Sequence, residues 1–238
     1  MEISPPMKQM GYDRAIVVFS PEGRMYQVEY ARKAVEKATT VLGITFAGGV
    51  LLASGKTIQK LLVPESVEKI AKIDEHVMIG SCGILGDARN LVDYARVKSQ
   101  INKLTFNESI EIFALSKDLA DRIQRFTQMG GIRPYGVGLL IAGLDQTVPR
   151  LYETDPSGTL REWRGHAIGR GAKDARKLLI EEYKEGMSKE KAIDLALRAL
   201  KAGEKKLTSR TVELAVIADK KMKKYARPEL KEVLKKYI

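Results

Sequence analysis

The chain alternates between stripes of apolar residues at helical spacing and short, fully apolar runs. Val28, Ala31, Val35 and Ala38 recur at intervals of three and four, which predicts an amphipathic helix over residues 26–38. Similar stripes predict five further helices. These cover residues 87–104, 107–129, 172–185 and 188–205, and the C-terminal segment from Pro228 onwards.

The apolar runs predict strands. Residues 40–46 and 50–54 flank Ala47-Gly48-Gly49, which is a hairpin signal. Segments that are apolar at every position, such as residues 139–142, are typical of strands buried on both faces. The remaining strands are expected at residues 69–83 (a pair), 135–144, 150–155, 161–168 and 211–218.

The order of these elements indicates the fold class. Strand groups are followed by pairs of helices, so strands and helices do not alternate one to one, and a doubly wound parallel sheet is excluded. We therefore predict an α+β fold with two central sheets covered by helices on the outside. No linker rich in Pro, Gly and Ser divides the chain, so residues 12–238 are expected to form one domain. Pro5 and Pro6 predict a flexible segment over residues 1–11.

Composition narrows the setting in which the protein works. The 238 residues are 44% hydrophobic and 30% charged, as in ordinary globular proteins. The single cysteine, Cys82, has no partner for an internal disulfide and is expected to pack in a strand. The apolar run at residues 135–144 is shorter than the roughly 20 residues that span a bilayer, and residues 1–14 lack a signal-peptide core. We predict a cytoplasmic protein without a membrane partner.

The net charge of +11 raises the question of nucleic acid. Most basic residues are interspersed with acidic ones, and the dense cluster of Lys220, Lys221, Lys223 and Lys224 has no aromatic platform beside it. A solvated surface explains this charge best, and a docking surface for acidic partners comes second. A nucleic-acid-binding protein is the third alternative, and its affinity would fall steeply with salt.

Metal and cofactor chemistry have little support in the sequence. His76 and His166 are separated from each other and from Cys82 by spacings unlike those of metal ligands, so both are expected to be structural surface histidines and no metal is predicted. Residues 169–173 precede a helix but lack the Lys-Ser/Thr end of a phosphate-binding loop. We predict no cofactor.

Thr39 and Thr40 pose the main chemical question. A threonine nucleophile of the N-terminal type uses its own free α-amine as general base. Both threonines are internal, and cleavage between Ala38 and Thr39 would remove the amphipathic helix over residues 26–38. We therefore predict no catalytic residue in the intact chain. A self-processed hydrolase with Thr39 as its nucleophile stays open as the alternative.

Several motifs spread along the chain carry a family resemblance. They are YDRAI (12–16), FSPEGR (19–24), YQVEYA (26–31), EKI (68–70), GDAR (86–89), GGIRPYGV (130–137) and DPSG (155–158). Through them the chain resembles the archaeal-type α subunits of the 20S proteasome over nearly its whole length. The resemblance implies the N-terminal-nucleophile hydrolase fold, a four-layer α-β-β-α sandwich with an extra N-terminal helix.

The resemblance also implies a function without catalysis. The chain would form a seven-membered outer ring with other α subunits, against β subunits that hold the threonine nucleophiles of the endopeptidase complex. The acidic residue and the lysine that support the nucleophile in catalytic relatives fall on Gly55 and Lys69. Unfolded proteins would pass through the ring during ATP-dependent degradation.

The same resemblance assigns roles to individual residues. Residues 1–11 would form the gate, and Tyr12, Asp13, Pro21 and Tyr30 would hold it open.

Lys69 would bind the C-terminal tails of activator ATPases in a pocket between subunits, and Met129-Gly130-Gly131 would contribute to the axial constriction. The sequence departs from the family pattern at Ile84-Leu85-Gly86 and at Arg170, where serine is usual, and the details of subunit contacts at these positions stay open.

Overall fold

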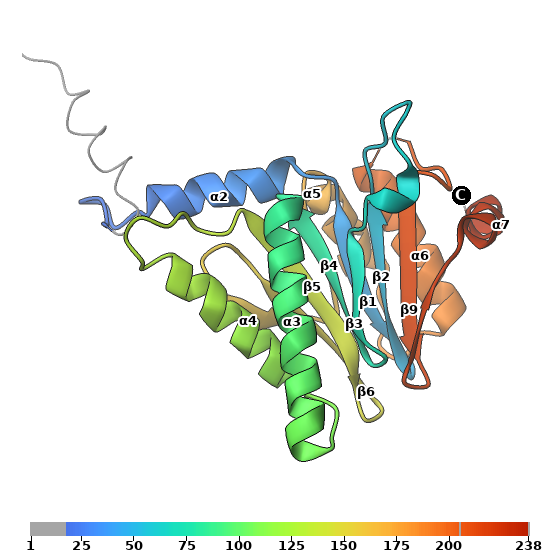
Figure 1. Cartoon of the computed structure of the whole chain (residues 1–238). Helices are drawn as coiled ribbons and strands as arrows, with labels where there is room; N and C mark the ends of the chain where they lie inside the picture. The colour runs from blue at the N-terminus through green and yellow to red at the C-terminus, as the bar shows by residue number, and fades with distance from the viewer. Residues whose placement is uncertain (1–17, 205, 238) are drawn as a thin grey trace, which may run out of the picture.

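Two antiparallel sheets lie face to face in the computed structural model, which describes residues 18–204 and 206–237 (Figure 1). The first sheet has the strand order β10-β9-β2-β1-β8 and the second the order β3-β4-β5-β6-β7. The first sheet consists of β1 (Val41–Phe46), β2 (Gly49–Gly55), β8 (Gly165–Ile168), β9 (Val212–Ala218) and β10 (Lys221–Lys224). The second consists of β3 (Ile70–Asp74), β4 (Val77–Gly83), β5 (Val137–Asp145), β6 (Val148–Thr154) and β7 (Leu160–Glu162).

Helices cover the outer faces of both sheets. On the first sheet lie α5 (Ala172–Glu182), α6 (Lys189–Gly203) and α7 (Arg227–Tyr237), and on the second lie α3 (Leu85–Phe106) and α4 (Ile112–Phe126). Three buried apolar clusters fill the spaces between the layers, one between the sheets and one under each helix layer. This arrangement confirms the predicted four-layer α-β-β-α sandwich.

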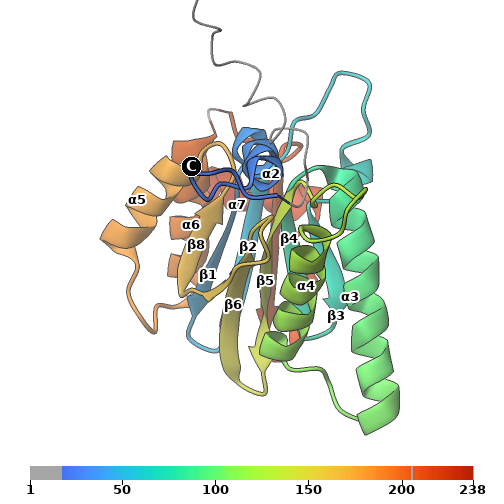
Figure 2. The same ribbon diagram turned by 90° about the vertical axis from the view of Figure 1, so that its left-hand side faces the viewer.

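The first helix, α2 (Tyr26–Lys37), belongs to neither outer layer. It lies across one end of the sandwich, as the two perpendicular views show (Figures 1 and 2). The helix contacts β4 and β5, its half-buried Val35 packs against the apolar cluster between the sheets, and its Val28 is buried, which agrees with the apolar stripe read from the sequence. A one-turn helix, η1 (Pro64–Ser66), interrupts the loop between β2 and β3 at the same end.

Two strand predictions were wrong in detail. Residues 161–168 form two strands in different sheets, because the chain crosses from β7 to β8 at Trp163 and Arg164. The lysine cluster at residues 220–224 was not predicted as a strand, yet residues 221–224 form β10 and pair with β9. Its lysines lie on the edge of the first sheet, where charge discourages pairing with another chain.

The helix predicted over residues 107–129 was also wrong at both ends. Asn107 ends α3 in the left-handed conformation at φ 55°, so α4 begins only at Ile112. It ends at Phe126, three residues before Met129, so Gly130 and Gly131 lie in the turn beyond it. No helix among the described residues is long and apolar enough to cross a membrane.

The histidines are buried, contrary to the prediction of surface positions. His76 Nε2 lies 2.8 Å from the carbonyl oxygen of Ile110, and the His166 ring stacks on Trp163 with ring centroids 4.1 Å apart. His166 Nε2 also lies 3.4 Å from Glu153 Oε2, so both histidines are buried packing residues with a polar atom beside the ring. Among residues 18–204 and 206–237, no group of three His, Cys, Asp or Glu side chains is placed to hold a metal ion.

Candidate functional site

The segment that enters α2 carries the residues predicted to open a gate. Pro21 lies in an exposed turn, closed by a hydrogen bond from the Gly23 amide to the carbonyl oxygen of Ser20. Tyr30 lies on α2 with 49% of its surface exposed. Tyr12 and Asp13, and with them the whole of residues 1–11, lie outside the described residues.

Thr39 and Lys69 meet where α2 leads into β1. The Lys69 Nζ donates to Thr39 Oγ1 at 2.7 Å and also to the Thr39 carbonyl oxygen. Lys69 is only 5% exposed, and this burial lowers the pKa of Lys69 from 10.5 to about 8. The structure therefore brings together two of the three elements that the resemblance implied for a threonine hydrolase.

The acidic residue of the catalytic relatives and the general base are both missing at Thr39. Gly55 carries no side chain, and the Thr39 nitrogen is part of the peptide bond to Ala38. The carbonyl oxygen of Ala38 accepts a hydrogen bond from the Arg170 amide at 2.9 Å, which holds the uncut segment in place. A buried Lys-Thr pair without an α-amine lacks the base that the N-terminal mechanism requires.

A carboxylate that sequence analysis missed lies beside Gly55. Glu204, at the end of α6, accepts hydrogen bonds from the Thr40 amide at 2.8 Å and from Thr40 Oγ1 at 2.9 Å, and pairs with the Arg170 guanidinium. An ideal Cβ at Gly55 would lie 3.1 Å from Glu204 Cγ, so glycine leaves this carboxylate its room. Burial alone would raise the pKa of Glu204, but the bonds from Arg170 and Thr40 outweigh it and lower that pKa.

A second buried carboxylate positions Lys69 itself. Glu213 on β9 accepts hydrogen bonds from the backbone amides of Lys69 and Ile70, both at 2.9 Å. Its other oxygen pairs with Lys56 Nζ at 3.2 Å, and Lys56 also donates to the carbonyl oxygens of Pro64 and Val67. This Lys56–Glu213 pair, separated by 157 positions in the sequence, fixes the loop that leads into Lys69.

The turn at Met129-Gly130-Gly131 is anchored by an ion pair of Arg133, which follows it in the chain. Arg133 makes a two-pronged pair with Asp87, at 2.6 and 2.7 Å, and Asp87 also accepts from the Gly136 amide. Met129 is 43% exposed, and Gly131 has the left-handed φ of 81° that glycine adopts without strain. The turn is thus anchored at its far end while Met129 reaches the surface.

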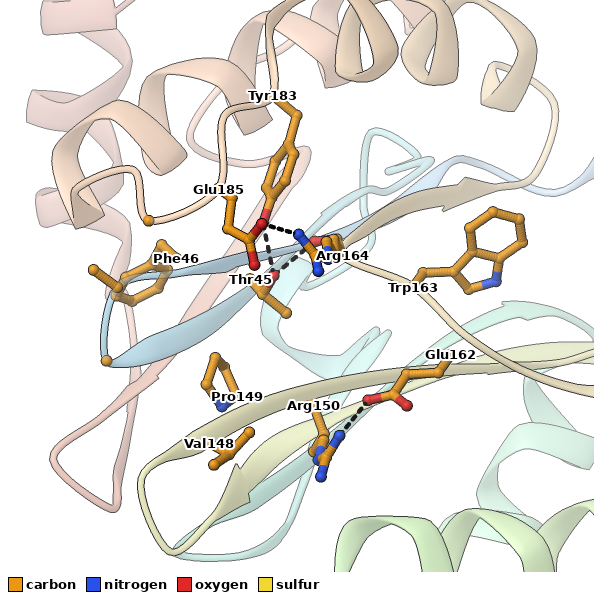
Figure 3. A pocket seen from close by; sticks show the side chains of 13 residues that line it. Thr45, Phe46, Val148, Pro149, Arg150, Glu162, Trp163, Arg164, Tyr183 and Glu185 are labelled. Carbon is orange, nitrogen blue, oxygen red and sulfur yellow. Dashed lines mark hydrogen bonds and ion pairs between the residues drawn. The ribbon is translucent and has the colours of Figure 1, made fainter.

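One cavity lies next to the Lys69 region, and a second lies at the opposite end of the sandwich. One of about 400 Å³ is lined by Glu68 and Ser81, next to Lys69, and by α3 residues. Another of about 590 Å³ lies where β1 ends and β6 begins (Figure 3). The charged side chains of the second cavity are paired with one another, Arg150 with Glu162 and Arg164 with Glu185, so it presents no evident reactive group (Figure 3).

Burial of Lys69 predicts a dependence of stability on pH. Its folded pKa of about 8 lies below the unfolded value of 10.5, so between these values the unfolded chain binds more protons and stability rises with pH. Compared with a Lys69→Met variant, the wild-type chain should gain about 1–1.5 kcal/mol of unfolding free energy between pH 7 and pH 9. Urea titrations of both chains at several pH values measure this difference. A difference that stays constant with pH would contradict it.

These features define a class of protein. A sandwich of two antiparallel sheets between helix layers, with a threonine and a lysine paired at the start of its first strand, has the fold of the N-terminal-nucleophile hydrolases. Here a helix precedes the threonine and covers that end of the sandwich (Figure 1).

Comparison with known proteins identifies the family. The family model described as "Proteasome subunit" matches residues 35–217, and the model of the N-terminal signature of A-type proteasome subunits matches residues 12–34. The chain is 52% identical to the proteasome α subunit of Methanosphaerula palustris, with 89% of each chain covered. It is 47% identical to that of Methanosarcina acetivorans, with 97% of this chain and 95% of the relative covered. The chain belongs to the proteasome α-subunit family of the archaeal type. It is thus a subunit of the 20S core, and the family assembles with other proteasome subunits in a ring.

Proposed function

We propose that this chain is a non-catalytic ring subunit of the 20S core, which controls the entry of unfolded proteins into a cytoplasmic degradation chamber. The observation that carries the proposal is the state of Thr39: its nitrogen is an amide, and its side chain is bonded to Lys69. Because Thr39 has no general base to activate it, peptide cleavage would be carried out by the β subunits. The outer ring would consist of seven copies of this chain, or of this chain together with other α subunits.

Labelling and mass together test the non-catalytic role. The chain expressed alone and the chain assembled with its β partner are treated with an epoxyketone, which reacts with a free N-terminal threonine. We expect an unlabelled α chain with its full mass of 26.5 kDa, and label only on β. An α chain that begins at Thr39 and carries the label would replace the proposal with the self-processed hydrolase.

The gate is assigned to the N-terminal segment. Residues 1–11 would cover the axial opening, and Tyr12, Asp13, Pro21 and Tyr30 would hold the segment away from the axis when it opens. Support comes from the match of the N-terminal signature to residues 12–34 and from the exposed position of Pro21 and Tyr30 at one end of the sandwich. Met129-Gly130-Gly131, anchored through Arg133, would narrow the opening.

Lys69 is assigned to the docking of activator ATPases. Its ammonium would pair with the terminal carboxylate of an activator's C-terminal tail, which would enter between neighbouring α subunits at the end of the sandwich where α2 meets β1. Support comes from its burial and from the rigid loop that presents it, which Glu213 and Lys56 hold. The Coulomb attraction between an ammonium and a carboxylate grows as the effective dielectric constant around them falls, so the partly desolvated Lys69 would attract a terminal carboxylate at short range.

Replacing Lys69 with alanine is expected to lower activator-stimulated peptide hydrolysis at least tenfold, because losing one partner of a buried charge pair costs about 2–5 kcal/mol. The measurement is peptide hydrolysis by the assembled core with and without the activator ATPase. Deleting residues 2–11 in the same Lys69→Ala core should restore fast hydrolysis without activator. Exposed Lys177 on α5 provides a matched control, whose alanine variant should respond like wild type. Full stimulation of the Lys69→Ala core would refute the docking role.

A further inference from the structure

A cavity of about 410 Å³ lies between α3, α4 and the segment that leads into β5. The two helices form the outer layer on the second sheet, side by side (Figure 2). Ile132 and Arg133 line the cavity, and in the chain they directly follow the turn at Met129-Gly130-Gly131. The cavity therefore lies beside the segment that is proposed to narrow the axial opening.

Aromatic rings hold a single arginine in the wall of this cavity. The Cζ of Arg122, in the last turn of α4, lies 4.3 Å from the centroid of the Tyr94 ring and 5.6 Å from that of the Phe126 ring. The Phe126 ring in turn packs against the buried Tyr135, with ring centroids 4.6 Å apart. These contacts fix the plane of the guanidinium, so less conformational entropy would be lost when it binds a ligand.

The guanidinium of Arg122 lacks an acceptor. Within residues 18–204 and 206–237 its Nε is buried and has no hydrogen-bond partner. Its two terminal nitrogens have no partner there either, but they are not buried. Buried donors are normally paired in folded proteins, so this cation is the group around the cavity that still needs an acceptor.

The carboxylates nearby in the chain and in the cavity wall bind other donors. Asp118, four residues earlier on α4, accepts from Tyr94 Oη at 3.1 Å and pairs with Lys98 at 3.1 Å. Asp87, in the cavity wall, is paired with Arg133 through both of its oxygens. Since Asp87 and Arg133 neutralise each other, the cavity keeps one net positive charge, that of the aromatic-bound guanidinium.

We propose that this cavity, through Arg122, binds the acidic side chains of unfolded polypeptides that enter the ring. The inference rests on the proposed function and adds to it a preference for substrates rich in Glu and Asp. A guanidinium can donate two parallel N–H bonds to the two oxygens of a carboxylate, and the terminal nitrogens of Arg122 are accessible for this. In a ring of copies the cavity recurs beside each turn that narrows the opening, so an entering chain meets the same cation several times.

The test measures peptide binding to the assembled core, with residues 2–11 of this chain deleted and the β threonines blocked by an epoxyketone. Two rhodamine-labelled decapeptides with blocked ends are compared by fluorescence anisotropy, one with several Glu residues and one with Gln at the same positions. The Glu peptide should bind about fivefold more tightly than the Gln peptide, as expected for a partly exposed ion pair. This preference should shrink as the salt concentration rises.

Charge-matched variants separate the cavity from the general charge of the ring. Arg122→Gln should abolish the preference for the Glu peptide, and Arg122→Lys, which keeps the charge but loses the planar fork, should retain part of it. Arg125→Gln, on the exposed side of the same helix, removes the same charge and should keep the full preference. Equal loss in Arg122→Gln and Arg125→Gln would mean that diffuse charge attracts the peptide, and would overturn the site.

The chain expressed alone distinguishes substrate from a carboxylate of the β partner. A preference for the Glu peptide in the isolated α ring that is absent from the core would mean that a β subunit fills the cavity, and would overturn the substrate role. Native mass spectrometry of the same samples separates the two proposals. A ring of full-length chains that binds both peptides equally overturns this inference and leaves the proposed function standing. A chain that begins at Thr39 overturns the proposed function and this inference with it.

Discussion

Replacing Glu213 with alanine is expected to destabilise the chain by about 3–5 kcal/mol, the usual cost of breaking a buried ion pair from one side. Glu213 and Lys56 are 6% and 9% exposed, so the remaining ammonium would stay largely out of water. The substitution would also leave the amides of Lys69 and Ile70 without their acceptor. Each buried amide without a partner adds about 1–3 kcal/mol, part of which relaxation and water recover.

Urea unfolding of the purified chain measures this loss. Glu213→Gln keeps an oxygen that can accept from the two amides but loses the charge opposite Lys56. It should therefore lower the free energy of unfolding by less than Glu213→Ala does. Glu181→Ala, on the exposed surface of α5, should change stability by no more than about 0.5 kcal/mol. If Glu213→Ala matched Glu181→Ala, the Lys56–Glu213 pair would not stabilise the loop that leads into Lys69.

Replacing Gly171 with alanine is expected to cost about 3 kcal/mol and to prevent ring assembly. Gly171 precedes α5, and a Cβ there would lie 2.3 Å from the carbonyl oxygen and 2.4 Å from the Cα of Gly203, at the end of α6. These are backbone atoms, so the two helices would have to move apart. The backbone of Gly171 has φ −96°, which alanine also adopts, so the loss would come from crowding alone.

Gly86 supplies the matched control for this substitution. It lies in the first turn of α3, and an added Cβ would meet nothing within 4 Å. Gly86→Ala should therefore be neutral or stabilise the chain by up to about 1 kcal/mol. Thermal unfolding and native mass spectrometry of both variants measure the contrast. Equal stability of Gly171→Ala and wild type would mean that α5 and α6 separate without cost.

The sequence by itself determined the layers of this protein. Fully apolar runs predicted β1, β2 and β5 because a strand buried on both faces needs apolar residues at every position. The stripe on residues 26–38 predicted α2, because helical periodicity is a local property of the chain. The internal position of Thr39 is likewise a fact of the sequence, and it carries the non-catalytic interpretation.

Only the tertiary structure decided the chemistry around Thr39 and Lys69. Glu204 lies 164 positions from Thr40, and Glu213 lies 144 positions from Lys69, so no local pattern indicates either contact. Both carboxylates resemble surface residues in the sequence, and so do the two histidines that the fold buries. The division of residues 161–168 between two sheets has the same origin. Which side chains become buried partners depends on how distant strands pack, and periodicity along the chain does not encode that packing.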